Sequence, residues 1–227
     1  SGLVPEYILP RPHNVLRSLW DNRAEFLKHA AYTGTAAVVG FTASAVLGVA
    51  GAVALSSSRW VRRAFYPYAV FFQTVPLVAV APLLVIVLGT GSLPVVVSAF
   101  IVSVFPVLAN ALAGLLATDP ALLDLFKLYG AGPVATLWKL RLPAALPQVL
   151  TGLRVAAGLA VIGAIVGEFF AGAGGLGYAI DGRKTAQRPQ DVFALLLLAA
   201  ALGIAMFVAI NAVSSAALKN WHPSERE

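Results

Sequence analysis

The chain contains no cysteine among its 227 residues. Disulfides, cysteine nucleophiles and thiolate-bound metals are therefore excluded. Histidine is also scarce: the three histidines, His13, His29 and His222, lie far apart and none stands in the H-E-x-x-H spacing of a zinc protease. The sequence also shows no Ser/His/Asp set and no carboxylate pair at a common depth. These absences argue against a metal site and against a membrane enzyme.

Charge is the second scarcity. Only 11% of the residues are charged, whereas a soluble domain carries about a quarter. The deficit is concentrated in runs without any Lys, Arg, Asp or Glu, namely Ala30–Ser58, Ala64–Thr118, Val155–Gly167 and Val192–Leu218. Because a helix needs roughly 20 apolar residues to cross the hydrocarbon core of a bilayer, the sequence predicts an all-α, polytopic transmembrane bundle.

The apolar runs predict about five spans. Their expected bounds are Ala30–Leu55, Phe65–Leu88, Leu93–Ala117, Pro143–Phe170 and Val192–Leu218. The second of them contains Pro76 and Pro82, so we expect it to be kinked and to be covered by protein or to line a cavity, because lipid cannot satisfy the freed backbone groups.

Residues 1–29 form a separate, mixed segment in which Val15–Lys28 is expected to be one amphipathic helix, lying on the membrane surface or against the bundle. No cleavable signal peptide is expected at Ser1.

Lys and Arg in the short loops favour a cytoplasmic position for Arg59–Arg63 and residues 119–141. The tail, 219–227, is then cytosolic and the first residue lies outside, so either the protein begins outside or an upstream span precedes it. We attribute the net charge of +6 to basic residues that flank the spans and meet anionic lipid head groups, rather than to binding of nucleic acid.

A charged, amphipathic segment, Asp124–Pro143, separates two apolar runs. The apolar residues of its first part recur at helical spacing, Gly130–Pro133 interrupts that helix, and Val134–Leu140 is expected to form a second one. Leu142 precedes Pro143 and is expected to be extended or bent, with Pro143 beginning the next span. Two interpretations stay open: a lever that a soluble partner moves, or a connector resting on the lipid surface.

The segment resembles the EAA loop of binding-protein-dependent ABC importer permeases. That loop has an acid, a glycine six residues on, nine intervening residues and then aliphatic-x-Leu-Pro, and this chain has Asp124, Gly130, Leu140, Leu142 and Pro143 at those positions. It departs in having Asp for the usual Glu, and Leu-Phe where small residues are common. The resemblance continues through Gln73–Leu83 with the turn Gly89–Gly91, through Pro143–Pro147, through Thr151–Arg154 and through Gly167–Tyr178.

The resemblance implies a type I ABC importer permease of the nitrate/sulfonate/taurine branch, in the bacterial inner membrane, with residues 30–218 as its transmembrane domain. Among these permeases, the chain most resembles those for pyrimidine or flavin-type vitamins and their precursors. Sulfonate, taurine or nitrate is the alternative solute. Implied partners are two cytosolic ATPases, which would carry ATP and Mg while this chain binds no cofactor, a second permease copy and an extracytoplasmic solute-binding protein. The ATPases would grip the loop 119–142, and its expected coupling residues are Asp124, Lys127, Gly130, Ala131, Gly132, Leu140, Leu142 and Pro143.

Five residues at membrane depth are candidates for the translocation pathway or its gate: Gln73, Pro76, Asn110, Arg154 and Glu168. Charged groups in spans are costly and face the bundle interior or a water-filled cavity. The alternatives are that Glu168 extends to the interface, that Arg154 anchors there or pairs with a carboxylate, and that Gln73 and Asn110 bond across helices.

The glycines of the loop after the fourth span, Gly172, Gly174, Gly175 and Gly177, formally include the G-x-G-x-x-G spacing of a dinucleotide site. That motif requires a strand before it and a helix after it, so it is rejected here. We expect instead a tight re-entrant loop near the outer mouth, because glycine permits unusual backbone conformations and close packing. A self-sufficient secondary transporter or channel is the rival class, but the sequence shows neither internal inverted repeats nor many intramembrane ionisable residues.

Overall fold

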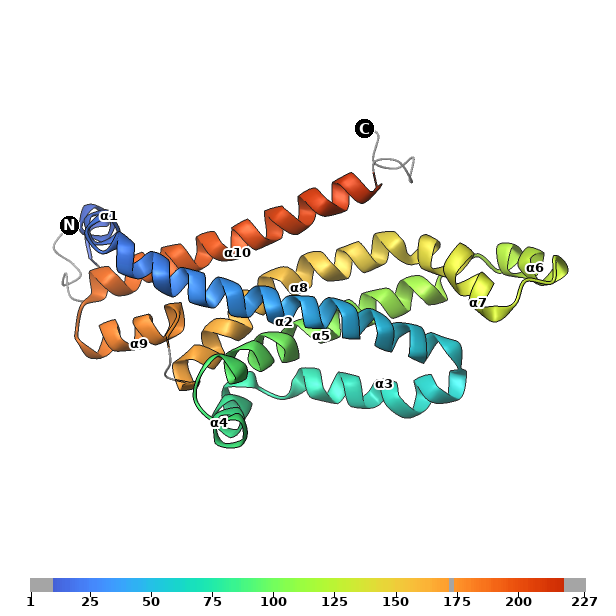
Figure 1. Ribbon diagram of the computed structural model, residues 1–227, viewed down its shortest axis with the longest axis horizontal. Helices are drawn as coiled ribbons and strands as arrows, with labels where there is room; N and C mark the ends of the chain where they lie inside the picture. The colour runs from blue at the N-terminus through green and yellow to red at the C-terminus, as the bar shows by residue number, and fades with distance from the viewer. Residues whose placement is uncertain (1–9, 172–173, 219–227) are drawn as a thin grey trace.

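The computed structural model describes residues 10–171 and 174–218, and every regular element within them is helical. Most of the helices run along the long axis of the molecule (Figure 1). In chain order they are α1 Pro12–Asp21, α2 Arg23–Ser57, α3 Arg59–Thr74, α4 Leu77–Leu88, α5 Ser92–Leu116, α6 Pro120–Leu128, α7 Pro133–Thr136, the π-helical turn η1 Leu137–Arg141, α8 Leu142–Ala171, α9 Leu176–Thr185 and α10 Pro189–Leu218. The predicted all-α fold is confirmed.

Four helices of the described chain are long and apolar enough to cross a membrane: α2, α5, the continuous helix Pro133–Ala171 and α10. These helices cover most of the four charge-free runs. Residues 64–91 of the second run lie outside them. The expected spans at both ends of the chain and in its middle therefore correspond to real helices.

The predicted second span, Phe65–Leu88, is not one helix. α3 ends at Thr74, Val75 is extended with φ −73° and ψ 123°, and Pro76 precedes α4. The proline disfavours the helical conformation of the residue before it, which separates the two helices. α4 is seen nearly end-on in Figure 1 and so crosses the direction of α3. Pro82, the other expected kink, lies inside α4 without ending it.

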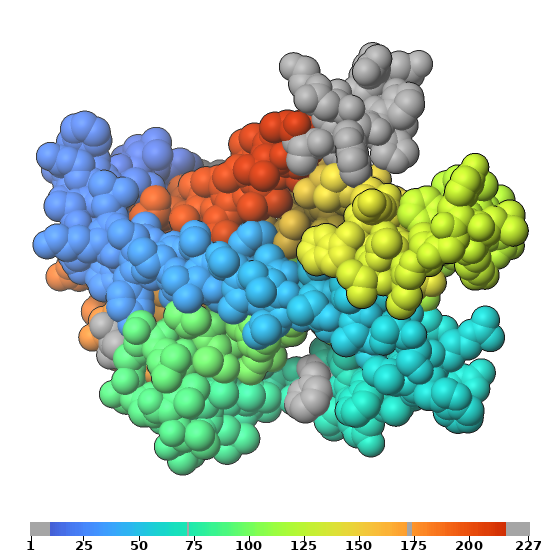
Figure 2. Space-filling model, turned by 45° about the vertical axis from the view of Figure 1, so that its right-hand side comes forward, coloured from blue at the N-terminus to red at the C-terminus, as the bar shows by residue number. Residues whose placement is uncertain are grey.

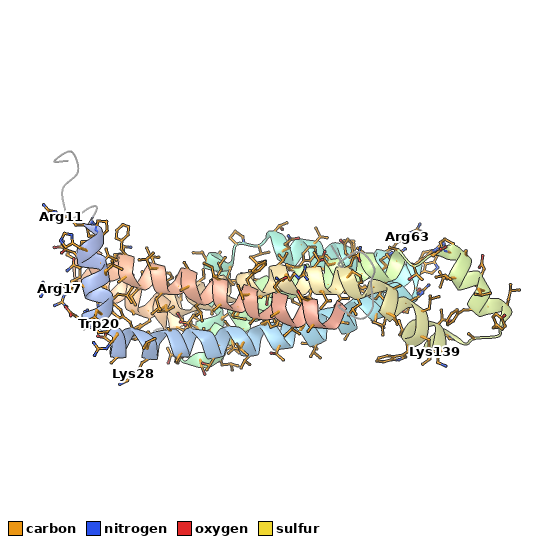
Figure 3. The ribbon with its side chains drawn as sticks, turned by 90° about the horizontal axis from the view of Figure 1, so that it is seen from above. Arg11, Arg17, Trp20, Lys28, Arg63 and Lys139 are labelled. Atoms are coloured by element: carbon orange, nitrogen blue, oxygen red, sulfur yellow. The ribbon has the colours of Figure 1, made fainter. Side chains whose placement is uncertain are left out.

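The predicted amphipathic helix Val15–Lys28 is also divided. Asn22, with φ −102° and ψ 13°, separates α1 from α2, and its side-chain Nδ2 donates to the Ser18 carbonyl oxygen at 3.0 Å. Arg23 and the residues up to Lys28 therefore extend the first span as its polar end. α1 alone lies across the end of the bundle (Figure 3).

The core forms where α5 packs between α2 and α8. Glycines allow the close approach: a Cβ at Gly40 of α2 would lie 2.6 Å from the Ala99 Cβ, and one at Gly163 of α8 would lie 2.7 Å from the Ser98 carbonyl oxygen. The Oγ atoms of Ser44 and Ser103 are 2.6 Å apart across the α2–α5 contact. Small residues and buried hydroxyl bonds of this kind hold membrane helices together without a hydrophobic driving force.

The molecule has two distinct ends. Arg63 and Lys139 lie at one end, together with α6 and α7, while Arg17 and Lys28 lie at the other (Figures 1 and 3). We call the first the coupling end, after the role that the sequence leads us to expect for residues 119–142, and the second the α9 end, since α9 packs against α2, α8 and α10 there. The chain thus places the two segments that the sequence singled out, residues 119–142 and the glycine loop, at opposite ends of α8.

Candidate functional site

The first candidate site is α6, which projects from the coupling end. Asp119 is the N-cap of the helix, and its Oδ1 accepts the Ala121 amide hydrogen at 2.8 Å. One of the free N-terminal amides of the helix is thereby satisfied. Lys127 Nζ lies 2.8 Å from Asp124 Oδ1 on the exposed surface. No residue of α6 is buried, although Leu122, Leu125 and Leu128 are apolar and exposed.

The turn after α6 explains the glycines of Asp124–Pro143, which we call the coupling segment. Gly130 has φ +71°, a conformation that favours glycine. The Gly130 amide donates to the Lys127 carbonyl and the Ala131 amide to the Phe126 carbonyl, both at 2.9 Å, which is the Schellman pattern that ends a helix. Gly132 then precedes Pro133 at the start of α7. The expected interruption between two helices is confirmed.

The expectation for Leu142 and Pro143 is wrong. Leu142 is helical, with φ −63° and ψ −46°, and its amide donates to the Leu137 carbonyl in a π-helical turn. The wider turn accommodates Pro143, whose ring would crowd the carbonyl four residues earlier in an ordinary α-helix. The helix is consequently continuous from Pro133 to Ala171 over 39 residues, and Pro143 does not begin it. The bend of the coupling segment lies at residues 129–132 instead.

The second candidate site surrounds Glu168, which has no exposed surface. Its Oε2 accepts the Gly177 amide hydrogen at 2.8 Å, and Thr33 Oγ1 of α2 accepts the Leu176 amide hydrogen, also at 2.8 Å. Gly175 has φ +97°, and a Cβ there would overlap the Glu168 carboxyl group. The side chain is thus enclosed by protein rather than extended to the interface.

The other candidates for the translocation pathway differ in their exposure and hydrogen bonding. Gln73 and Pro76 are exposed where α3 and α4 meet, and Arg154 is half-buried on α8. Asn110 Nδ2 donates to the Pro106 carbonyl of its own helix at 2.8 Å. Arg154 and Glu168 lie about 21 Å apart along α8 at 1.5 Å per residue, so these two charged candidates do not form one cluster. Gly172 falls outside the described residues, as does the tail 219–227.

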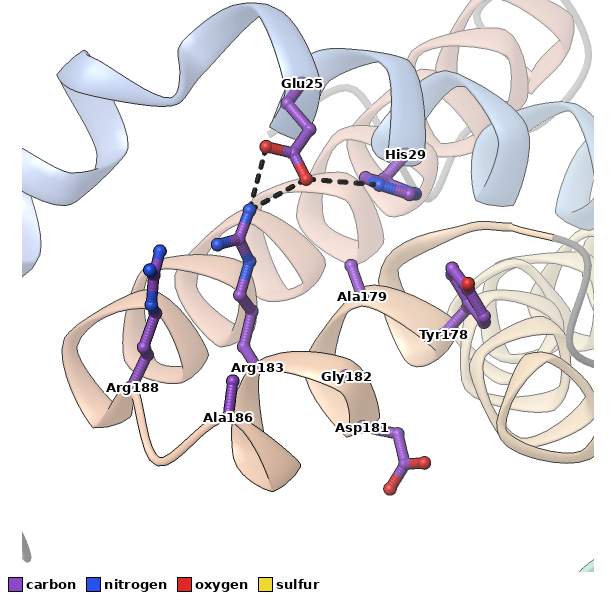
Figure 4. A pocket seen from close by; sticks show the side chains of 9 residues that line it. All are labelled: Glu25, His29, Tyr178, Ala179, Asp181, Gly182, Arg183, Ala186 and Arg188. Atoms are coloured by element: carbon purple, nitrogen blue, oxygen red, sulfur yellow. Dashed lines mark hydrogen bonds and ion pairs between the residues drawn. The ribbon is translucent and has the colours of Figure 1, made fainter.

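The sequence reasoning missed an ion-pair network at the α9 end, of which Figure 4 shows the pairing of Arg183 with Glu25. Arg183 of α9 has a side chain only 18% exposed; its Nη2 lies 2.8 Å from both Glu25 carboxylate oxygens and its Nη1 lies 3.3 Å from Asp191 Oδ2. Ser18 Oγ donates to Asp191 Oδ1 at 2.6 Å. The network joins α1, α2, α9 and α10. Nothing in local spacing could reveal it, because Glu25 and Arg183 are 158 residues apart.

Neither candidate site presents the donor set of a metal centre. Within residues 10–171 and 174–218, no three side chains of His, Cys, Asp or Glu gather closely enough to hold a metal ion. The first site is an exposed helix, and the second joins helices at the opposite end of the molecule.

Comparison with known proteins adds the family. Residues 44–226 match the family described as the binding-protein-dependent transport system inner membrane component. The chain is 34% identical over 210 residues to a probable ABC transporter permease of Haemophilus influenzae, covering 92% of this chain and 86% of that protein. It is 35% identical over 206 residues to the formylaminopyrimidine transport permease of Halalkalibacterium halodurans, covering 90% and 82%. It is 30% identical over 206 residues to the riboflavin transport system permease of Chloroflexus aurantiacus, covering 90% and 77%.

Solved structures show the same fold. The inward-facing MetNI methionine ABC transporter matches with a TM-score of 0.67 at 18% identity, covering 84% of this chain and 97% of that one. The resemblance that the coupling segment carries is therefore confirmed by the family match and by the fold. This multi-pass membrane chain belongs to the binding-protein-dependent inner membrane components, the permeases of type I ABC importers.

Proposed function

We propose that two copies of this chain form the pathway of an ATP-driven importer, that cytosolic ATPases drive it through α6, and that an extracytoplasmic binding protein delivers the solute. We further propose that the solute is a small organic molecule of the pyrimidine or vitamin-precursor type. ATP and Mg belong to the ATPase subunits, and this chain supplies the contact helix and the pathway.

The observation that carries the proposal is the exposed, well-formed helix α6. It is capped at its start, ends in a Schellman turn and buries none of its residues in the bundle. In Figure 2 the segment from α6 to α7, coloured yellow-green, projects from the body of the molecule. A short helix with exposed leucines such as Leu125 and Leu128, the latter 85% exposed, is suited to fit into a groove of a partner protein.

The connection between α6 and the membrane-spanning part supports this proposal. α6 connects through residues 129–132 to the continuous helix Pro133–Ala171. Leu140 is buried near the start of this helix and Ala145 contributes to the core cluster around α5. We infer that a displacement of this helix at its coupling end reaches the packed α5–α8 contact.

The solute assignment rests on relatives. The permeases for formylaminopyrimidine and riboflavin are 35% and 30% identical to this chain, whereas a putative aliphatic sulfonate permease of Escherichia coli is 28% identical and the taurine permease of the same organism is 26% identical. The two more similar permeases are named for nitrogen-rich heteroaromatic solutes. This gradient favours a heteroaromatic solute over a sulfonate.

The test of the coupling role is co-purification of an ATPase from native membranes, identified by mass spectrometry. Wild type is compared with the double variant Leu125→Ser and Leu128→Ser. We expect these changes to leave the fold intact, because both leucines are exposed. The matched control is Leu16→Ser with Leu27→Ser, two exposed leucines at the α9 end. We expect an ABC ATPase with wild type and with the control, and loss of it from the α6 variant.

Absence of an ATPase from the wild-type sample, or its retention by the α6 variant, contradicts the proposal. The solute is tested separately by uptake into proteoliposomes that contain the purified permease, its ATPase and its binding protein. Riboflavin and a formylaminopyrimidine are compared with taurine, and ATP-dependent uptake of taurine alone would refute the assignment of a heteroaromatic solute.

A further inference from the structure

The coupling mechanism leaves one buried charged group without a role. Glu168 lies three residues before the end of α8 and is completely buried. A carboxylate within a membrane-spanning helix is costly, and such groups mark functional positions. Its Oε2 accepts the Gly177 amide hydrogen, while its Oε1 has no hydrogen-bond partner within the described residues.

The partner of this carboxylate is the start of another helix. Gly177 is the second residue of α9, so its amide is one of those that no residue within the helix can satisfy. α9 has no capping side chain of its own, because Gly175 stands at its N-cap. The amide before it, on Leu176, is satisfied by Thr33 of α2. Two other helices therefore supply the cap that α9 lacks, and the negative charge is favourable there.

The glycines of the loop make this contact possible. A Cβ at Gly175 would overlap the Glu168 carboxyl group, and a Cβ at Gly177 would overlap the Ile165 carbonyl oxygen and lie 3.0 Å from the Glu168 Cβ. The backbone of residues 175–177 therefore rests directly on the last turns of α8. No side chain other than hydrogen fits between the two helices at these points.

The other end of α9 is held by α2 again and by α10. Arg183, in its last turn, is paired with Glu25 of α2 and with Asp191 of α10. α9 is therefore attached to α8 through the Gly177–Glu168 bond, and to α2 and α10 through the bond of Leu176 to Thr33 and the pairs of Arg183 with Glu25 and Asp191. A movement of α8 relative to α2 and α10 must turn α9 or break one of these attachments.

We propose that Glu168 is a positioning residue for transport, which fastens the start of α9 to α8 so that movement of α8 turns α9. The inference rests on the proposed function, since the drive enters through α6 at the opposite end of the same continuous helix. Glu168 acts as a hydrogen-bond acceptor for Gly177, and its effect on the solute is exerted through α9 rather than by contact. The alternative role, in which its negative charge binds a cation or carries a proton along the pathway, predicts a different mutational pattern.

The first experiment separates these roles by measuring solute moved per ATP hydrolysed in proteoliposomes. Glu168→Gln keeps an oxygen that accepts the Gly177 amide hydrogen, so we expect transport per ATP within about twofold of wild type; Glu168→Ala leaves that amide unsatisfied, so we expect a loss of about tenfold or more. Thr33→Val removes the neighbouring acceptor and should change the ratio in the same direction. The control is Ser98→Ala, a buried residue of α5 against Gly167, which should leave the ratio unchanged.

The second experiment measures α9 directly and does not depend on transport. Because the chain has no native cysteine, a spin label at Asp181→Cys, exposed on α9, reports only that helix. We expect the same spectrum in the otherwise unchanged chain and in the Glu168→Gln background, and an additional, more mobile component in the Glu168→Ala background. Thermal unfolding of each purified variant establishes that a loss of transport does not arise from an unfolded bundle.

The outcomes are decisive in both directions. If Glu168→Gln fails as completely as Glu168→Ala, the charge and not the hydrogen bond is needed, and the proposal is overturned. If Glu168→Ala leaves the spin-label spectrum unchanged, α9 is not fastened by this residue. If wild type shows no ATP-driven uptake at all, the proposed importer function fails, whereas the mobility comparison still decides whether Glu168 holds α9.

Discussion

Single atoms at the helix contacts decide how closely the bundle can pack. Gly163 and Gly158 belong to the same helix, α8, but a Cβ at Gly163 would lie 2.7 Å from the Ser98 carbonyl oxygen and 2.8 Å from the Ala99 Cα, whereas one at Gly158 would meet nothing within 4 Å. We expect Gly163→Ala to lower the free energy of unfolding by about 1–3 kcal/mol through overpacking.

The matched control is Gly158→Ala, for which we expect no loss and a gain of up to about 1 kcal/mol, because alanine favours the helix. Thermal unfolding of the purified permease in one detergent measures both variants. Equal stability of the two would show that the α5–α8 contact yields to an added methyl group.

The ion-pair network offers a second comparison between two arginines that share one carboxylate. Arg183 is 18% exposed and lies 3.3 Å from Asp191 Oδ2, while Arg188 is 58% exposed and lies 4.0 Å from the same atom. Removing Arg183 leaves the nearly buried Asp191 without its closer charge partner, so we expect Arg183→Gln to cost roughly 3 kcal/mol. Arg188→Gln should cost less than about 1 kcal/mol, as is usual for an exposed pair. Chemical denaturation in detergent distinguishes the two, and the reverse order would contradict this account of the network.

Among the elements, α6 depends on its own ends because it has no buried residue to stabilise it. Asp119→Ala removes the acceptor of the Ala121 amide hydrogen, and a lost N-cap costs about 1 kcal/mol. We expect the Kd of the ATPase for the permease to rise about fivefold in consequence. Asp119→Asn keeps a capping oxygen and should bind like wild type. The affinity of the ATPase for each variant, held in nanodiscs, tests this prediction. An equal loss of affinity in both variants would indicate that the charge of Asp119 matters rather than its capping hydrogen bond.

Long elements could be predicted from the sequence because composition alone distinguishes a helix in lipid. The charge-free runs identified α2, α5, α8 and α10, and the glycine-rich stretch at residues 130–132 identified the turn after α6. Composition could not reveal where a helix is interrupted or continued. Val75 is extended before Pro76, which ends α3, yet Leu142 is helical before Pro143 because a π-helical turn precedes it. The same local rule therefore gives opposite outcomes, and the surrounding helix decides.

The candidate site was predicted in part for a similar reason. Glu168 and the glycines near it could be recognised as unusual, since charge is rare in spans and four of the six residues 172–177 are glycine. Their mutual contact depends on the loop folding back onto α8, and the Arg183 network depends on four helices meeting. Such contacts between distant parts of the chain leave no trace in spacing.

For the molecule as a whole, the arrangement of the two ends predicts a sidedness. Arg63 and Lys139 lie at the coupling end, and Lys28 lies at the α9 end (Figure 3). All three positions can be changed singly to cysteine in a chain that has none. In sealed right-side-out vesicles we expect a membrane-impermeant maleimide to label Lys28→Cys, but to label Arg63→Cys and Lys139→Cys only after the membrane is opened. Labelling of Arg63→Cys and Lys139→Cys from opposite sides would contradict the fold itself.

The detachment of α6 from the bundle has a consequence for how such importers diversify. Since none of its side chains contributes to the core, residues 120–128 can change without disturbing the packing of α5 against α8. Under the proposed function, the surface that binds the ATPase and the surface that admits the solute can then vary separately. A family built in this way could exchange motors and cargoes independently, and a chimaera carrying the α6 of a relative should accept that relative's ATPase while transporting its own solute.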